Sequence, residues 1–149
     1  VRRRSDIVIA SCGGAPKDMQ LYQAVKSLAN AAGFTKPGGD ILLIARCQEL
    51  YGNSQLQAWT ELHPDRESAV RQLQQSFVLG AHKLLGLHAV CSKFRVHLYS
   101  SVPDPIAELL GVHPVGDVQA WVDANVLPGV DAAALPCASL TFPLPPAAP

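Results

Sequence analysis

The chain has 149 residues, which is enough for one domain with a hydrophobic core of its own. Hydrophobic residues make up 48% of it, charged residues make up only 16%, and the formal net charge is zero, a balance that argues against nucleic-acid binding. No apolar run approaches the roughly 20 residues that a membrane-spanning helix needs. The low charge fits either a small, well-buried domain or a surface that another domain or subunit covers.

The start of the chain and its cysteines point to a cytoplasmic fragment. A valine stands first and a strand-like run follows almost at once, so we expect a piece of a longer protein. The four cysteines, Cys12, Cys47, Cys91 and Cys137, contain no C-x-x-C pair. We interpret them as mostly buried, reduced thiols, which favours the cytoplasm.

The first 45 residues follow the pattern of one β-α-β unit. Ile7–Ser11 is an apolar, β-branched run typical of a strand buried on both faces, and Gly13-Gly14 predicts a turn after it. A helix is expected over 18–32, with Pro16 in an early helix position and Gly33 just past the end.

A turn over 36–40 and a second buried strand over 41–45 complete this unit, which is almost always right-handed. A third strand is expected over 94–99, where apolar and polar residues alternate. Further helices are expected over 55–62, 64–76, 77–92, 105–110 and 117–125.

Two glycines, Gly80 and Gly86, fall inside the helix expected over 77–92. Interior helical glycines cost about 1 kcal/mol each, so they suggest the close approach of another backbone or of a ligand. Near the end of the chain, an edge strand is expected over 138–144 and a loosely ordered, proline- and alanine-rich tail over 143–149.

The alternation of strands and helices predicts an α/β fold, a three-layer sandwich with a mostly parallel sheet and helices on both faces. We expect an α/β domain over 1–136, with 137–149 as a possible edge strand and tail. Ligands in such folds bind outside the carboxyl ends of the strands. The loops 12–18, 46–53 and 100–105 should therefore meet at that edge.

The turn and helix after the first strand hold the strongest candidate site. Gly13-Gly14 could let backbone amides approach a ligand, or could be an ordinary tight turn, and it is not a G-x-G-x-x-G dinucleotide motif. Tyr22 and Lys26 share a helix face, and Gln23 neighbours Lys26. Lys26 could hold a carboxylate or phosphate, or could simply extend over the sheet edge.

The histidines and tryptophans give no further site by spacing. His82 and His88 do not fall on one helix face, and the other three histidines are scattered, so no metal ligand is predicted. We interpret His88 as a core histidine and Trp59 and Trp121 as packing residues. The sequence contains no nucleophile elbow, P-loop or H-E-x-x-H motif.

The order Gly-Gly-x-Pro-x-Asp followed by Leu-Tyr-Gln-Ala-Val-Lys resembles the C-terminal domain of the nickel-pincer-dependent lactate racemase family. The matching residues are Gly13, Gly14, Pro16, Asp18, Tyr22, Gln23, Ala24 and Lys26. The chain departs from the family pattern at Ala15, where the family often has tyrosine, and in the loop 46–53. The resemblance implies that Tyr22, Gln23 and Lys26 face cofactor and substrate, and that Phe77 is similar in position to an aromatic residue that packs on the substrate.

The resemblance further implies part of an isomerase, a 2-hydroxyacid racemase or epimerase similar to lactate racemase. Its nickel-pincer nucleotide, a pyridinium-derived cofactor, would be bound mainly by an absent N-terminal domain that also carries the catalytic histidines. We therefore expect no catalytic residue and no metal ligand in this fragment, and no activity from it alone. The expected partners are a small 2-hydroxyacid and that N-terminal domain, with no nucleic acid and no membrane.

Two other functions remain open from the sequence. The chain could be a stand-alone α/β module that binds a phosphate or nucleotide at Gly13-Gly14. It could also be a non-catalytic docking domain whose apolar surface covers a partner.

Overall fold

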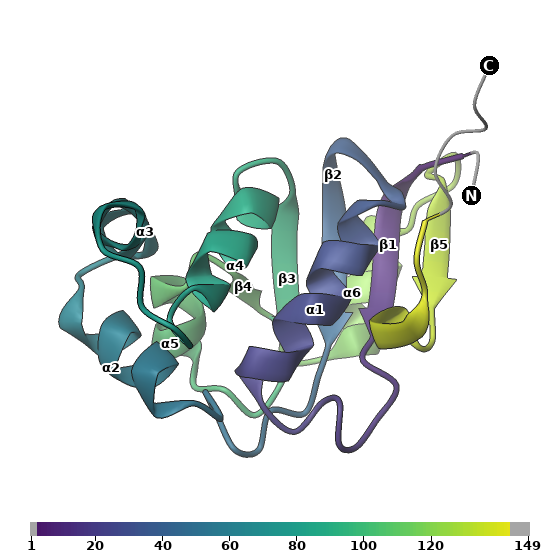
Figure 1. The fold of residues 1–149 in the computed structure, drawn as a ribbon. Coiled ribbons are helices and arrows are strands. Elements are labelled where there is room, and N and C mark those ends of the chain that lie inside the picture. The colour runs from purple at the N-terminus through teal and green to yellow at the C-terminus, as the bar shows by residue number, and fades with distance from the viewer. Residues whose placement is uncertain (1–2, 144–149) are drawn as a thin grey trace.

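A computed structural model describes residues 3–143 and contains one parallel sheet of five strands. The strands are β1 (Ser5–Ser11), β2 (Thr35–Ile44), β3 (Arg95–Tyr99), β4 (His113–Pro114) and β5 (Ala132–Leu135). Their order in the sheet is β4-β3-β2-β1-β5, so β5 returns to the far side of β1 (Figure 1). The prediction of an α/β fold with a mostly parallel sheet is confirmed.

Helices cover both faces of this sheet (Figure 1). In front lie α1 (Leu21–Ala32), α4 (Lys83–Cys91) and the 3₁₀ helix η1 (Ala138–Leu140), and α6 (Val118–Asn125) lies behind. The short α5 (Asp104–Leu109) connects β3 to β4, while α2 (Ser54–Leu62) and α3 (Arg66–Gln75) lie beyond α4. None of the helices within residues 3–143 has the length and apolar character to cross a membrane.

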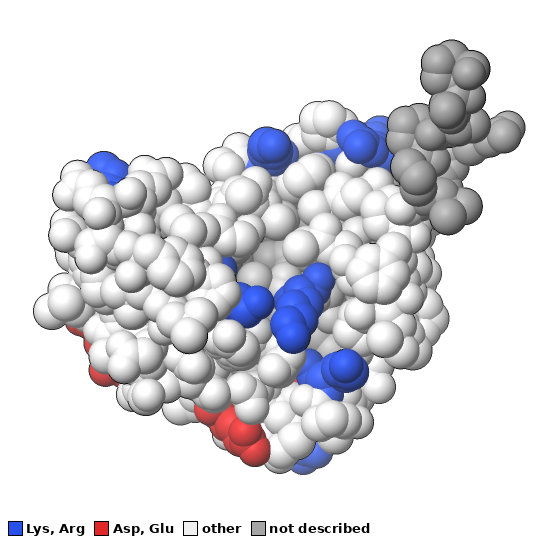
Figure 2. All heavy atoms as spheres, in the orientation of Figure 1, with Lys and Arg blue, Asp and Glu red and all other residues white. Residues whose placement is uncertain are grey.

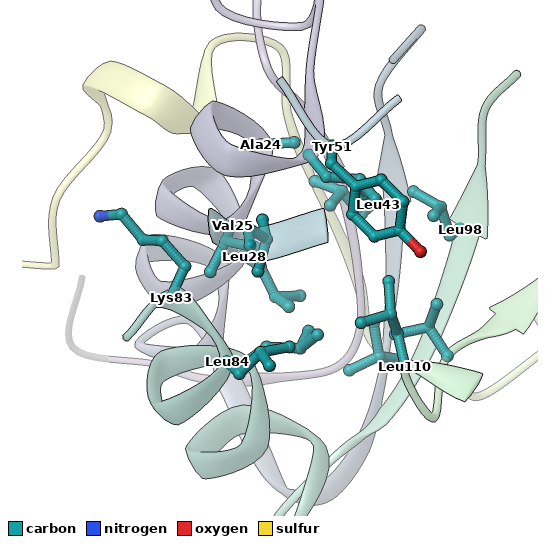
Figure 3. A pocket seen from close by; sticks show the side chains of 14 residues that line it. Ala24, Val25, Leu28, Leu43, Tyr51, Lys83, Leu84, Leu98 and Leu110 are labelled. Atoms are coloured by element: carbon teal, nitrogen blue, oxygen red, sulfur yellow. The ribbon is translucent and has the colours of Figure 1, made fainter. Parts of the chain in front are cut away.

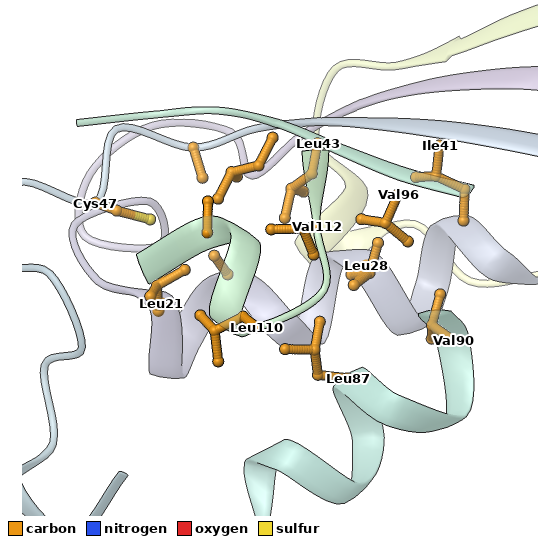
Figure 4. Packing of buried hydrophobic residues seen from close by; sticks show 14 of the residues in the cluster. Leu21, Leu28, Ile41, Leu43, Cys47, Leu87, Val90, Val96, Leu110 and Val112 are labelled. Carbon is orange, nitrogen blue, oxygen red and sulfur yellow. The ribbon is translucent and has the colours of Figure 1, made fainter. Parts of the chain in front are cut away.

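The main core lies between the sheet and the helices in front of it (Figure 4). Alternate residues of the strands point there, among them Leu43 of β2 and Val96 of β3, and they meet Leu28 of α1 and Leu87 of α4. On the opposite face, the ring of His97 lies 4.9 Å from that of Trp121 on α6. Because successive strand residues point to opposite faces, this contact makes α6 the third layer.

Several helix boundaries differ from the predicted ones. The helix α1 begins at Leu21 rather than residue 18, because Gly13 and Gly14 adopt positive φ and the Lys17 amide closes a turn onto the Gly14 carbonyl. Pro16 therefore lies in this turn and not in the helix. The helix expected from residue 77 begins only at Lys83, since Gly80 has a φ of +95°.

Two strand predictions were also inexact. The segment predicted as a turn over 36–40 belongs to β2, which pairs with β1 through an irregularity between Ser5 and Ile7. The edge strand predicted over 138–144 is wrong, because η1 occupies 138–140 and the strand at that edge is β5. Most of the predicted tail over 143–149 lies outside the described residues.

Candidate functional site

The three loops that follow β1, β2 and β3 meet at the carboxyl edge of the sheet, as the sequence predicted. The Cys47 amide donates to the Asp18 carbonyl at 2.6 Å, which joins the first loop to the second. The Ser101 amide donates to the Arg46 carbonyl at 2.8 Å, which joins the second to the third. Ligands bind at this edge in open α/β sheets, so the loops and the first turn of α1 form the candidate site.

The first amides of α1 are already occupied by neighbouring carbonyls. Leu21 donates to Leu50 at 2.8 Å and Tyr22 donates to Tyr51 at 3.2 Å, both in the loop after β2. The next two amides donate to the Gln20 carbonyl. A free helix N-terminus would attract an anion through such amides. Because these amides are occupied, an anion at this edge would have to be bound by side chains.

Three aromatic rings form a cluster beside the first turn of α1. The ring of Tyr22 meets that of His82 edge-on, with 6.4 Å between centroids, and the centroid of the Phe77 ring lies 5.6 Å from that of His82. The side chain of Phe77 is 65% exposed. The structure thus brings two of the sequence-predicted residues, Tyr22 and Phe77, together through His82.

Two lysines flank Tyr22. The Nζ of Lys83, the first residue of α4, lies 5.1 Å from the centroid of the Tyr22 ring. Lys26 is exposed one helical turn after Tyr22, on the same face of α1. Within residues 3–143, neither amine forms an ion pair with a carboxylate. Figure 2 shows basic side chains near the centre of this face and acidic ones along its lower margin.

Gln23 lies on the other side of α1. It precedes Asn30 by seven residues, which is about two helical turns, and the Asn30 side chain donates to the Ala138 carbonyl of η1 at 2.7 Å. Gln23 therefore faces the η1 side, whereas Tyr22 faces α4.

The Gly13-Gly14 turn lies on the η1 side too. A Cβ on Gly13 would lie 3.3 Å from the Cys137 Sγ, and one on Gly14, at a φ of +81°, would meet nothing within 4 Å. Among the described residues, no hydrogen bond joins this turn to Tyr22, Gln23 or Lys26. The space beside Gly14 leaves room for a ligand to approach the backbone.

A small apolar cavity of about 30 Å³ lies beneath this surface, between α1, α4 and the sheet (Figure 3). Leu28, Leu84 and Leu98 line it, and the stem of Lys83 closes one side. Tyr51 is buried at its wall, and burial raises the pKa of its hydroxyl. The volume suits about one or two water molecules and is too small for a substrate.

The buried cysteines are poor candidates for nucleophiles or metal ligands. Burial raises the pKa of Cys47 to about 12 and also raises that of Cys12, so both stay protonated at neutral pH. All four cysteines are free thiols. Over the described range 3–143, no group of three or more histidine, cysteine or acidic side chains could hold a metal ion.

Sequence reasoning missed two residues that contact Tyr22, His82 and Lys83. The Gly80 amide donates to His82 Nδ1 at 3.0 Å, so the neutral ring carries its proton on Nε2 and presents it as a donor. Both residues were assigned to the interior of a long apolar helix. The signal that could have placed them is Gly80, whose positive φ ends the preceding segment just before them.

Comparison with known proteins gives consistent matches. A family model described as the lactate racemase C-terminal domain matches residues 1–78. The lactate racemase of Thermoanaerobacterium thermosaccharolyticum is 32% identical over 69 residues, which are 46% of this chain and 16% of that protein. The lactate racemase of Lactiplantibacillus plantarum is 40% identical over 47 residues, 32% of this chain and 11% of that protein.

Solved structures extend the likeness in fold over nearly the whole chain. The lactate racemase apoprotein from T. thermosaccharolyticum superposes with a TM-score of 0.81 at 19% identity, over 94% of this chain and 36% of that one. A Thermotoga maritima protein gives a TM-score of 0.65 at 13% identity, over 97% of this chain and 38% of that one. The chain thus spans little more than a third of the solved relatives. Since the family model covers more than half of its residues, this chain belongs to the family of lactate racemase C-terminal domains.

Proposed function

We propose that this chain is the C-terminal domain of a nickel-pincer-dependent 2-hydroxyacid racemase or epimerase, in which it contacts both the substrate and the cofactor. The observation that carries the proposal is Lys26, an exposed amine without an ion-pair partner in residues 3–143, beside Tyr22 at the sheet edge where ligands bind. With the first amides of α1 occupied, this amine is the natural contact for a carboxylate.

The residues present fit an anionic cofactor and an anionic substrate. The amines of Lys26 and Lys83 offer positive charge, and the open space beside Gly14 would admit a phosphate or carboxylate to the turn. When bound, the family's cofactor supplies acceptance and return of hydride at the carbon that carries the hydroxyl. No described cluster in this domain could ligate nickel, so the metal would have to be held elsewhere.

In this arrangement the domain binds and orients, and does not itself move a proton. Lys26 fixes the carboxylate, while Tyr22 and Gln23 offer a hydroxyl and an amide from the two sides of α1. Phe77, which is 65% exposed, would be buried by the ligand and would exclude water. The catalytic histidines would belong to an N-terminal domain, so the fragment alone should be inactive. We also expect the protein to act in the cytoplasm.

The class is tested on the full-length protein, co-expressed with the cofactor-synthesis machinery. Nickel content and racemisation are measured with a panel of D- and L-2-hydroxyacids. About one nickel per chain, with inversion of at least one acid, supports the proposal and identifies the substrate. Well-folded protein with neither nickel nor turnover would instead favour a stand-alone binding module.

The role of Lys26 is tested by Lys26→Met in the same protein. Loss of a fixed charge-assisted contact in a desolvated site costs a few kcal/mol, so kcat/KM should fall by about 10²–10³-fold. Lys93→Met is the matched control, because Lys93 is also exposed but lies past the other end of α4. Unchanged turnover in Lys26→Met would point to a docking domain.

A further inference from the structure

We propose that Lys83 is a second anion contact of this site, and that the substrate is a 2-hydroxyacid with a second carboxylate. The inference rests on the proposed function, since it assigns Lys83 to the same substrate as Lys26. It concerns the substrate class and not the reaction, which would be the same for one carboxylate or two.

The packing of the Lys83 stem restricts the position of its amine. The aliphatic stem of Lys83 lines the apolar cavity together with Val25 and Leu84, and Figure 3 shows the amine pointing away from that cavity. The amine ends 5.1 Å from the centroid of the Tyr22 ring. A packed stem restricts where the amine of a lysine can lie more than a fully solvated stem does.

Two positively charged amines lie near Tyr22, whereas a single carboxylate carries only one negative charge. The Lys83 amine contacts the Tyr22 ring and Lys26 lies one helical turn further along the same face of α1, and within residues 3–143 neither amine pairs with an acidic side chain. Glu49, on the adjoining loop, instead accepts from Gln20 at 3.2 Å. If Lys26 holds the carboxylate next to the reacting carbon, Lys83 is left with a free charge that a second carboxylate would satisfy.

His82 adds a neutral hydrogen-bond donor beside the Tyr22 ring. Its Nδ1 accepts from the Gly80 amide, so Nε2 carries the proton, and the ring contacts those of both Tyr22 and Phe77. The contact of Lys83 with the tyrosine face is weak at an exposed site and leaves its N–H donors available. The ammonium of Lys83 and the imidazole N–H of His82, on consecutive residues that both contact the Tyr22 ring, are donors of the kind that a carboxylate accepts.

The test is equilibrium binding to the full-length, nickel-loaded protein, measured by titration calorimetry with malate and with lactate. The wild type should bind malate at least about tenfold more tightly than lactate. Lys83→Met should reduce that ratio about tenfold or more by weakening malate alone, while Lys83→Arg restores most of it. Lys93→Met, the exposed control, should leave both dissociation constants unchanged.

Three results would overturn the inference. A wild-type protein that binds lactate as tightly as malate, while it racemises lactate, rejects the second carboxylate and leaves the proposed function intact. Equal weakening of both acids by Lys83→Met, with a loss of nickel, would assign the amine to the cofactor. No effect of Lys83→Met or Lys83→Arg on either acid would leave the amine without a ligand. Absence of binding and of turnover with every acid would instead reject the proposed function itself.

Discussion

Tyr51 carries a hydroxyl that the fold does not satisfy. The side chain is only 2% exposed, and its Oη has no hydrogen-bond partner within residues 3–143. Figure 3 places it beside the apolar side chains of the cavity under α1. A buried hydroxyl without a partner costs about 1–3 kcal/mol, so this hydroxyl lowers the stability of the domain.

We therefore predict that Tyr51→Phe raises the free energy of unfolding by about 1 kcal/mol, because it removes the unpartnered hydroxyl and keeps the ring. Urea denaturation of the purified domain measures the change. Tyr99→Phe is the control, since Tyr99 is 41% exposed and its hydroxyl can reach water. A decrease in stability on Tyr51→Phe would mean that an ordered water in the cavity binds this hydroxyl.

At the scale of elements, α6 is held to the sheet by a small polar group. None of its residues is fully buried, and Trp121 contacts the ring of His97. His97 in turn shares Asp40 with Arg95, with 2.9 Å from His97 Nε2 and from Arg95 Nε to the same carboxylate oxygen. Burial disfavours the ionised form of Asp40, but the hydrogen bonds from Arg95 and His97 outweigh burial and lower its pKa.

This arrangement predicts a pH-dependent contribution to stability. Because the pKa of Asp40 is lower in the folded than in the unfolded chain, its contribution is complete above the ordinary aspartate value and is lost as the pH falls through the folded value. The free energy of unfolding of Asp40→Asn should lie below that of the wild type at about pH 7, and the gap between the two should narrow as the pH falls below the ordinary aspartate pKa of about 4. The exposed Asp123→Asn should show no such convergence, and a constant gap for Asp40→Asn would contradict the prediction.

The elements that the sequence predicted are those with a strong local pattern. The apolar runs of β1 and β2 and the alternation of β3 are confirmed, because burial on the sheet requires those patterns. The strand β5 was missed, since Ala132–Leu135 has weak strand propensity and becomes a strand by pairing with β1.

The candidate site was predictable for the same reason, and only in part. Tyr22 and Lys26 share a face because four residues separate them on one helix, which the sequence alone implies. The contact of Lys83 and His82 with Tyr22 depends instead on how α4 packs against α1, across about 60 residues of chain. Spacing rules do not reach over such a distance.

At the scale of the whole molecule, the low charge of the chain is accompanied by large apolar side chains that remain exposed next to the candidate site. Phe77 and Leu79, in the segment before α4, are 65% and 73% exposed, and both lie shortly before His82 and Lys83 of the candidate site. Large apolar side chains next to a ligand site mark a surface that another domain could cover. This is what the proposed N-terminal domain would do, and the basic centre of that face in Figure 2 would then be enclosed with the ligand.

The contacts of η1 bear on where the domain ends. The predicted boundary at residue 136 would remove η1, although Ala138 is fully buried against α1. Asn30 donates to the Ala138 carbonyl at 2.7 Å, and Ser139 Oγ donates to the Cys12 carbonyl at 2.8 Å, behind the glycine turn. We infer that the domain extends through η1.

A chain that ends at residue 136 should therefore be less stable than one that ends at residue 143. The two hydrogen bonds and the burial of Ala138 together predict a loss of about 2–3 kcal/mol in the free energy of unfolding. Urea denaturation of the two chains gives the difference, and Leu140→Ala in the longer chain is the control, because Leu140 is 68% exposed. Equal stabilities would place the boundary at residue 136 after all. A large loss would mean that η1 fixes the glycine turn from behind, so that variants of η1 alter the ligand edge without touching a ligand.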